Sequence, residues 1–218
     1  GAVLVDKSHN NKFENKEIDT LISRIVSRNN KVEFSENTDN MQSKLRFANS
    51  FVVILPIEEF TEDEITLLNE FVNKNGKLLL IADPDRKSSI NSVATELNII
   101  FSSDYLYNLK ENNGNFRFIT LKDFRKNEIT KKLSKIALYS SCPIQPLEKG
   151  IVFTGKDTYA SSLETISEYT PVIYFNSTLA LCDLTFFTSP FNSAADNNQL
   201  ISNIADFLTK TDRRFNIA

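Results

Sequence analysis

The single histidine of the chain, His9, follows an apolar segment at 3–5 and stands three residues after Asp6. Asp83 comes directly after another apolar segment at 77–82, and Asp183 comes near the end of a third at 179–184. An imidazole near carboxylates can act as a general base, or it can join them as ligands of a divalent metal ion. These residues are therefore the candidates for catalysis or ligand binding in this chain.

Polar residues that follow strands meet at one edge of a parallel sheet, where ligands of open α/β sheets bind. We therefore expect one ligand-binding site, with His9 as the candidate catalytic residue. We expect no group of metal ligands and no cofactor. Its expected members are Asp6, Ser8, His9, Asn10, Asp83, Asp183, Asp196 and Asn197. The alternative is structural: each aspartate ends a strand or caps a helix, and His9 is an exposed loop residue bonded to the backbone.

Several common sites are excluded by their missing motifs. The chain has no G-x-G-x-x-G or G-x-x-x-x-G-K-[ST] loop for dinucleotides or phosphates. It has no G-x-S-x-G or G-x-C-x-G elbow, and the turn at Ala82-Asp83-Pro84 carries neither a hydroxyl nor a thiol. A covalent hydrolase built on such an elbow is therefore excluded.

The two cysteines, Cys142 and Cys182, lie within or next to apolar segments and outside any C-x-x-C motif. Buried free cysteines are common, so we expect two buried thiols, with a disulfide as the alternative. One histidine and two cysteines cannot form a zinc site of several imidazoles.

Short β-type segments alternate with helical segments in the first half, which indicates an α/β fold with a mainly parallel sheet. A helix is expected to begin at Thr61, where Glu64 completes a capping box, and to end at Asn75-Gly76. The segment 98–133 is expected to be a loop-rich insertion with short strands. The other expected helices are 18–26, 41–48, 88–97 and 197–208, and the expected strands are 3–5, 32–34, 51–55, 77–82, 136–139, 151–154, 172–175 and 179–184.

The composition describes a globular domain without a nucleic-acid footprint. The chain has 218 residues, 41% hydrophobic and 24% charged, with a formal charge of −3 and no large block of one sign. We expect a single domain, 1–218, that needs no metal or disulfide to fold. No apolar run approaches the roughly 20 residues of a membrane helix. Because the chain starts at Gly1 next to an expected strand, we expect a soluble fragment of a longer protein, in which an anchor could tether it to a membrane.

Taken together, several segments resemble the DUF4350 group of uncharacterised prokaryotic proteins over nearly the whole chain. They are 5–10, 76–84, 104–109, 114–117, 181–187 and 196–208. This group is similar to the class I glutamine amidotransferase-like superfamily, and is related to the gliding-motility and intraflagellar-transport amidotransferase-like domains. The resemblance implies a flavodoxin-like three-layer sandwich, and those relatives are regarded as non-catalytic. Catalytic members carry a cysteine on a glycine-flanked elbow and a downstream histidine, which this chain lacks.

The favoured hypothesis is a pseudoenzyme: a non-catalytic amidotransferase-like module that binds a small polar ligand or a protein partner, in a membrane- or envelope-associated assembly. The alternative is a metal-assisted or His-based hydrolase of a small polar or sugar-like ligand, with His9 as the base. A deep polar pocket around His9 would favour ligand binding or catalysis. A filled site together with an exposed apolar patch would favour assembly.

Overall fold

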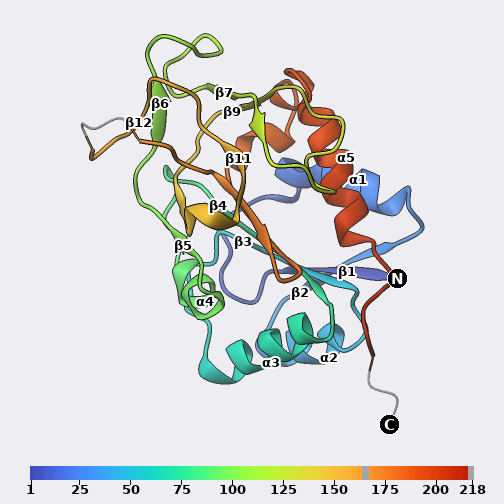
Figure 1. Ribbon diagram of the computed structural model, residues 1–218. Helices are drawn as coiled ribbons and strands as arrows, with labels where there is room; N and C mark the ends of the chain where they lie inside the picture. Colours follow the sequence, from blue (N-terminus) through green and yellow to red (C-terminus); the bar gives the residue numbers. More distant parts are fainter. Residues whose placement is uncertain (164–166, 216–218) are drawn as a thin grey trace.

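The structure is a computed structural model that describes residues 1–163 and 167–215. Its centre is a mixed eight-stranded sheet with helices packed against it, an α/β fold (Figure 1). The strands follow the order β2 (Lys31–Ser35), β1 (Ala2–Asp6), β3 (Ser50–Ile54), β4 (Lys77–Ala82), β14 (Thr178–Cys182), β13 (Val172–Phe175), β11 (Gly150–Phe153) and β8 (Asp123–Phe124). Pairs from β2 to β14 are parallel, whereas pairs from β14 to β8 are antiparallel. The parallel half is the half in which strands and helices alternate along the chain.

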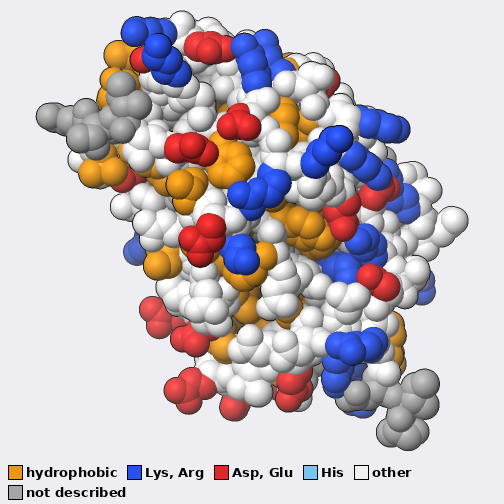
Figure 2. Space-filling view, viewed as in Figure 1, with side chains coloured by type: hydrophobic (Ala, Val, Ile, Leu, Met, Phe, Trp, Pro, Cys, Tyr) orange, Lys and Arg blue, Asp and Glu red, His pale blue; other side chains and the backbone are white. Residues whose placement is uncertain are grey.

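Helices cover both faces of the sheet, with α1 and α5 on one side and α2 and α3 on the other (Figure 1). They are η1 (Asn15–Ile18), α1 (Asp19–Val26), α2 (Thr38–Leu45), α3 (Glu62–Asn73), α4 (Asn91–Ala94), η2 (Thr95–Leu97) and α5 (Asn197–Leu208). The space-filling view shows charges of both signs across this side of the molecule (Figure 2). Within the described ranges, no helix is both long enough and apolar enough to cross a membrane.

Alternate side chains of each central strand pack on opposite faces of the sheet and contribute to two hydrophobic cores. Leu79 and Ile81 of β4 pack with α1 and α5, whereas Leu78 and Leu80 pack with α2, α3 and α4. Successive side chains of a strand point to opposite faces, so a strand covered on both sides must be apolar throughout. The uninterrupted apolar runs of the sequence are therefore explained by burial on both faces.

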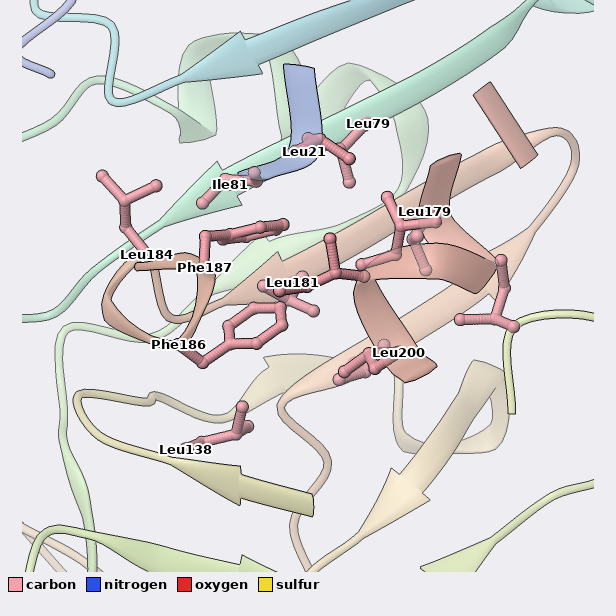
Figure 3. Close-up of a cluster of buried hydrophobic side chains, with 14 of the residues drawn as sticks. Leu21, Leu79, Ile81, Leu138, Leu179, Leu181, Leu184, Phe186, Phe187 and Leu200 are labelled. Atoms are coloured by element: carbon pink, nitrogen blue, oxygen red, sulfur yellow. The ribbon is translucent and has the colours of Figure 1, made fainter. Parts of the chain in front are cut away.

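The helix α5 confirms the expected closing helix at 197–208. Its side chains Leu200 and Ile204 have no exposed surface and lie in the core that also holds Phe186 and Phe187. Figure 3 shows Leu200 beside Leu181, Phe186 and the other side chains of this cluster. The helix is thus an integral part of one core.

The capping box of α3 is also confirmed. The Thr61 hydroxyl accepts from the Glu64 amide at 3.2 Å, and the Glu64 carboxylate accepts from the Thr61 amide at 2.8 Å. Asn75 takes the left-handed conformation after this helix, with φ of 68°. Both ends of α3 are therefore set by local sequence.

Three expected elements differ from the structure. The helix expected at 41–48 spans Thr38–Leu45, and the helix expected at 88–97 is reduced to α4 and η2. The strand expected in the core at 136–139 is β9 (Ile136–Leu138), which pairs outside the central sheet. An apolar run predicts burial but does not identify the partner strand, and here the partner lies in the insertion.

The remaining elements are short. Three two-stranded sheets pair β5 (Ile100–Phe101) with β10 (Ile144–Gln145), β6 (Leu106–Asn108) with β12 (Thr158–Ala160), and β7 (Ile119–Leu121) with β9. Three further 3₁₀ turns are η3 (Leu147–Lys149), η4 (Thr185–Phe187) and η5 (Phe191–Ser193). The segment 98–133 thus contributes four short strands, of which β8 joins the edge of the central sheet.

The expectation of two free thiols was wrong, because Cys142 and Cys182 form a disulfide with a Cα–Cα distance of 5.5 Å. Both cysteines lie in the core on the α2–α3 side of the sheet. Their apolar surroundings in the sequence indicated burial correctly. Their proximity depends on how the segment before β10 passes the end of β14, which the sequence pattern does not show.

Candidate functional site

The expected site residues do not form one site. They divide into a group around His9, a second group around Asp183, and a pair at the start of α5. Asp83 follows β4 and Asp183 follows the neighbouring β14, whereas Asp6 ends β1, which is separated from β4 by β3. Adjacent strands lie about 4.8 Å apart, so Asp6 starts roughly 10 Å from Asp83. The strand order therefore decides which acids meet.

The group around His9 is built on Asp6, whose side chain has no exposed surface. One Asp6 oxygen accepts from the Ser8 amide at 3.0 Å, from the Ser8 hydroxyl at 2.6 Å and from the Ser35 hydroxyl at 3.1 Å. The other oxygen lies 2.7 Å from Nδ1 of His9 and accepts from the Asn11 side chain at 3.3 Å. Asp6 is thus fully engaged by its own loop and by β2.

The other ring nitrogen of His9 faces a second carboxylate. Its Nε2 lies 2.9 Å from Oε2 of Glu64, which is the distance of an ion pair when the ring is protonated. The imidazole also stacks on Phe60, with ring centroids 3.7 Å apart and planes 9° from parallel. His9 is therefore clamped from both nitrogens and one face, with an exposed fraction of 2%.

The charges in this clamp stabilise one another. Burial would lower the pKa of His9, but the contacts with Asp6 and Glu64 outweigh it and raise that pKa above its usual value. Burial would likewise raise the pKa of Asp6, and the contact with His9 outweighs it and lowers that pKa. These contacts favour the imidazolium form of the ring, in which neither nitrogen has a lone pair to offer to a substrate.

These contacts contradict the structural alternative, in which His9 is an exposed loop residue bonded to the backbone. Glu64 was not among the expected site residues, although its place in the capping box was recognised. A carboxylate at the third position of a helix suggests a cap, and its second oxygen meets His9 only in the folded chain.

The second group joins Asp83, Asp85, Ser140 and Asp183. The Ser140 hydroxyl lies 2.8 Å from an Asp83 oxygen and 2.9 Å from an Asp85 oxygen. A hydroxyl has one hydrogen, so the arrangement is satisfied best when one of the two carboxyls is protonated. Burial raises the pKa of Asp83, which identifies Asp83 as the carboxyl that takes up the proton more readily.

Asp183 is the most deeply buried acid of this group, with no exposed surface. Its oxygens accept from the amides of Tyr139 at 2.7 Å and of Thr185 at 2.8 Å. Burial, with the nearby charge of Asp83, raises the pKa of Asp183 to about 7 despite these hydrogen bonds. Asp183 therefore ties the end of β14 to the chain after β9.

The pair at the start of α5 is also structural. The Asp196 carboxylate accepts from the amides of Ser134 at 2.7 Å and Lys135 at 3.0 Å, so the expectation that it caps α5 through its side chain was wrong. The Asn197 side chain accepts from the Ala137 amide and donates to the Ala137 carbonyl, each at 2.9 Å. Together they hold the strand β9 against α5.

Asn10 lies outside both groups. It is exposed, has φ of 53°, and its side chain accepts a hydrogen bond from the exposed Lys12 ammonium at 3.3 Å. Asparagine tolerates the left-handed region better than most residues, so its role here is to shape the turn.

A hollow of about 540 Å³ lies beside the second group and was not predicted from the sequence. Its lining includes Arg86, Thr185 and Thr188, but neither Asp83 nor Asp183. Arg86 is held by an ion pair with Glu17, which leaves it little freedom to bind an anion. Over residues 1–163 and 167–215, no three or more His, Cys, Asp or Glu side chains are grouped as metal ligands.

Comparisons with known proteins agree with the fold. No protein-family model matches the chain, and no curated protein matches it in sequence. The chain is similar in structure to the mmIFT52 N-terminal domain, with a TM-score of 0.77 at 13% identity over 98% of this chain and 100% of that one. It is also similar to a ThuA-like protein from Bacteroides uniformis (TM-score 0.56, 9% identity, 94% and 89% covered). A ThuA-like protein from Parabacteroides merdae gives a TM-score of 0.56 at 11% identity, with 99% and 92% covered. At these identities the likeness concerns the fold, which is compatible with the expected amidotransferase-like architecture.

Proposed function

We propose that this chain is a non-catalytic interaction module on an amidotransferase-like three-layer scaffold, as the resemblance to the DUF4350 group implies. The observation that carries the proposal is the clamped state of His9. A general base needs an unprotonated nitrogen within reach of substrate. Both ring nitrogens of His9 instead face carboxylates, at 2.7 Å and 2.9 Å, and the ring is closed off from solvent.

The surface supports interaction over catalysis. The site around His9 is filled, whereas large apolar side chains are exposed elsewhere, including Phe47 at 75% and Phe215 at 44%, which line one hollow. Exposed aromatic side chains in a hollow are typical of contact surfaces. A filled site with an exposed apolar patch is the combination that favours assembly.

The disulfide supports the envelope-associated setting of the proposal. Disulfides form and persist in oxidising compartments and are rare in the reducing cytosol. The Cys142–Cys182 bond therefore favours a location outside the cytoplasm, where tethering to a membrane could present the module to its partners.

The hydrolase alternative has weaker support. Asp183, with a pKa of about 7, has the acidity of a general acid or base. However, it is fully buried and its oxygens accept backbone amides, so a substrate has no access to it. His9 is closed in the same way.

The test combines an assay with a spectroscopic measurement. We expect the purified domain to release no ammonia from glutamine and not to hydrolyse p-nitrophenyl acetate above the rate of a Ser8→Ala, Ser140→Ala variant. In ¹⁵N NMR, both nitrogens of His9 should remain protonated at pH 7, above the usual imidazole pKa. Turnover that the variant loses, or a neutral His9 ring at pH 7 in the folded protein, would overturn the proposal.

A further inference from the structure

A groove lies between the C-terminal ends of α2 and α3, on the side of the sheet away from α5. It measures about 590 Å³, and the last described residues pass along it. Its lining is mixed, and the apolar part includes Leu67 and the exposed rings of Phe47 and Phe215, which are 75% and 44% accessible. We call this hollow the α2–α3 groove, and the side chains that matter are Arg46, Phe47, Leu67, Lys74, Arg213 and Phe215.

Positive charge gathers at this groove although the chain as a whole is acidic. Arg46, Lys74 and Arg213 line it, and Arg214 adjoins it through a 2.7 Å bond from its amide to the Lys74 carbonyl. None of these four forms an ion pair with any carboxylate of residues 1–163 and 167–215. Glu70 is the one acid in the lining. Figure 2 shows Lys and Arg side chains gathered at the lower right, near the end of the described chain.

Arg213 is held in place in the groove by several contacts. Its guanidinium lies over the rings of Phe71 at 4.4 Å and Phe215 at 4.5 Å, and its Nη1 donates to the carbonyls of Leu45 and Ala48 at the end of α2. Its Nε is buried and has no hydrogen-bond partner among the described residues. Burial without a carboxylate lowers the pKa of this guanidinium to about 10. A half-buried guanidinium without a carboxylate partner among the described residues is a position where an incoming carboxylate would be stabilised.

We propose that the α2–α3 groove binds an acidic, apolar peptide segment of a partner protein. Carboxylates of that segment pair with Arg46, Lys74 and Arg213, and its aliphatic or aromatic side chains cover Phe47 and Leu67. This inference rests on the proposed function and names the partner class of that interaction module. The groove presents both cations and apolar side chains. A purely acidic peptide would leave the apolar side chains uncovered, and a purely apolar peptide would leave the cations unpaired.

The surroundings of the groove favour a peptide over an anionic membrane. Four exposed acids lie at the opposite end of α3 or in the loop just before it, namely Glu58, Glu59, Glu62 and Asp63. A membrane surface lying along this helix would meet those acids and be repelled, whereas a short segment contacts the groove alone. A second copy of the chain could offer the same four acids, but the aromatic side chain among them, Phe60, is buried and cannot cover Phe47 and Leu67.

The experiment measures fluorescence anisotropy with a short fluorescein-labelled peptide composed of Glu, Leu and Phe. Two matched peptides carry Gln in place of every Glu, or Ser in place of every Leu and Phe. We expect the full chain to bind only the first peptide, and binding should weaken as salt screens the charges. Equal affinity for the Gln peptide would overturn the proposal.

Variants locate the binding. Arg46→Glu with Lys74→Glu, and separately Phe47→Ser, should each weaken peptide binding by about tenfold or more, the effect of losing a central charged or aromatic anchor. Lys126→Glu and Leu109→Ser are the matched controls, since both residues are exposed and outside the groove, and they should leave binding unchanged. Circular dichroism should show every variant folded, because the substituted side chains are at the surface. Unchanged binding in the groove variants would overturn the proposal.

Two further measurements separate other occupants. Binding to phosphatidylserine vesicles that the groove variants abolish, without binding of the peptide, would assign the groove to a membrane. Self-association in sedimentation that the same variants abolish would assign it to a second copy. Either result overturns the peptide proposal and leaves the non-catalytic module intact, whereas turnover in the glutamine or ester assay would overturn the module and leave peptide binding unaffected.

Discussion

Replacing His9 by alanine should be among the most destabilising single substitutions in this domain. The change leaves Asp6 and Glu64 buried without the cation between them, at exposed fractions of 0% and 3%. It also removes the ring that stacks on Phe60. Breaking a buried ion pair by deleting one partner costs about 3–5 kcal/mol, because the remaining charge stays desolvated.

The expected loss is therefore about 3–5 kcal/mol in the free energy of unfolding, against a total of about 5–15 kcal/mol for a typical domain. An exposed loop histidine would cost within about 0.5 kcal/mol. A buried, ion-paired His9 and an exposed loop His9 thus predict losses in the free energy of unfolding that differ several-fold.

The assay is urea unfolding followed by circular dichroism, with Lys12→Ala as a control in the same loop. Lys12 is exposed, so its variant should unfold like the wild type. The difference between wild type and His9→Ala should also depend on pH. The folded-state pKa of His9 is raised, so its contribution is complete below about pH 6.5 and declines as the pH rises through the folded-state pKa.

If His9→Ala lowers the free energy of unfolding by less than about 1 kcal/mol at pH 6, the contacts of His9 with Asp6 and Glu64 do not stabilise the fold. Breaking a buried ion pair by deleting one partner costs more than that. A loss that grows as the pH rises from 6 to 9 would refute the charge assignment, since it has the opposite sign to that of a raised histidine pKa.

Three other predictions follow from the described contacts. Cys142→Ser with Cys182→Ser should lower the free energy of unfolding by about 4 kcal/mol on the loop-entropy scale for a separation of 40 residues, and the unreduced wild type should show no free thiol to Ellman's reagent even in denaturant. The fragment 1–195 should show no cooperative thermal transition, because it lacks the buried side chains of α5; a transition near that of the full chain would contradict this. Asp183, whose pKa is raised to about 7, favours folding when protonated, so wild-type stability should decrease as the pH rises from about 4 to 7, and Asp183→Asn should flatten this dependence in urea titrations. An unchanged pH profile in that variant would show that Asp183 titrates normally.

Local sequence determined the central elements of this fold. The capping box at Thr61 and Glu64, the left-handed Asn75 and the apolar periodicity of α5 all depend on residues within a few positions of one another. Runs such as 51–55 and 77–82 are apolar without interruption, and strands of that kind are buried on both faces. The α/β class could therefore be predicted without the tertiary structure.

The tertiary structure alone decided which distant residues meet. Sheet order placed Asp83 beside Asp183 and put β3 between them and Asp6, so the aspartates of the single expected site were separated. Glu64 joined His9, and Cys142 joined Cys182, across 55 and 40 positions of sequence. The sequence pattern predicts burial and local conformation, because these depend on neighbouring residues. It does not predict strand order or the path of an insertion, because these depend on the free energy of the whole packed chain.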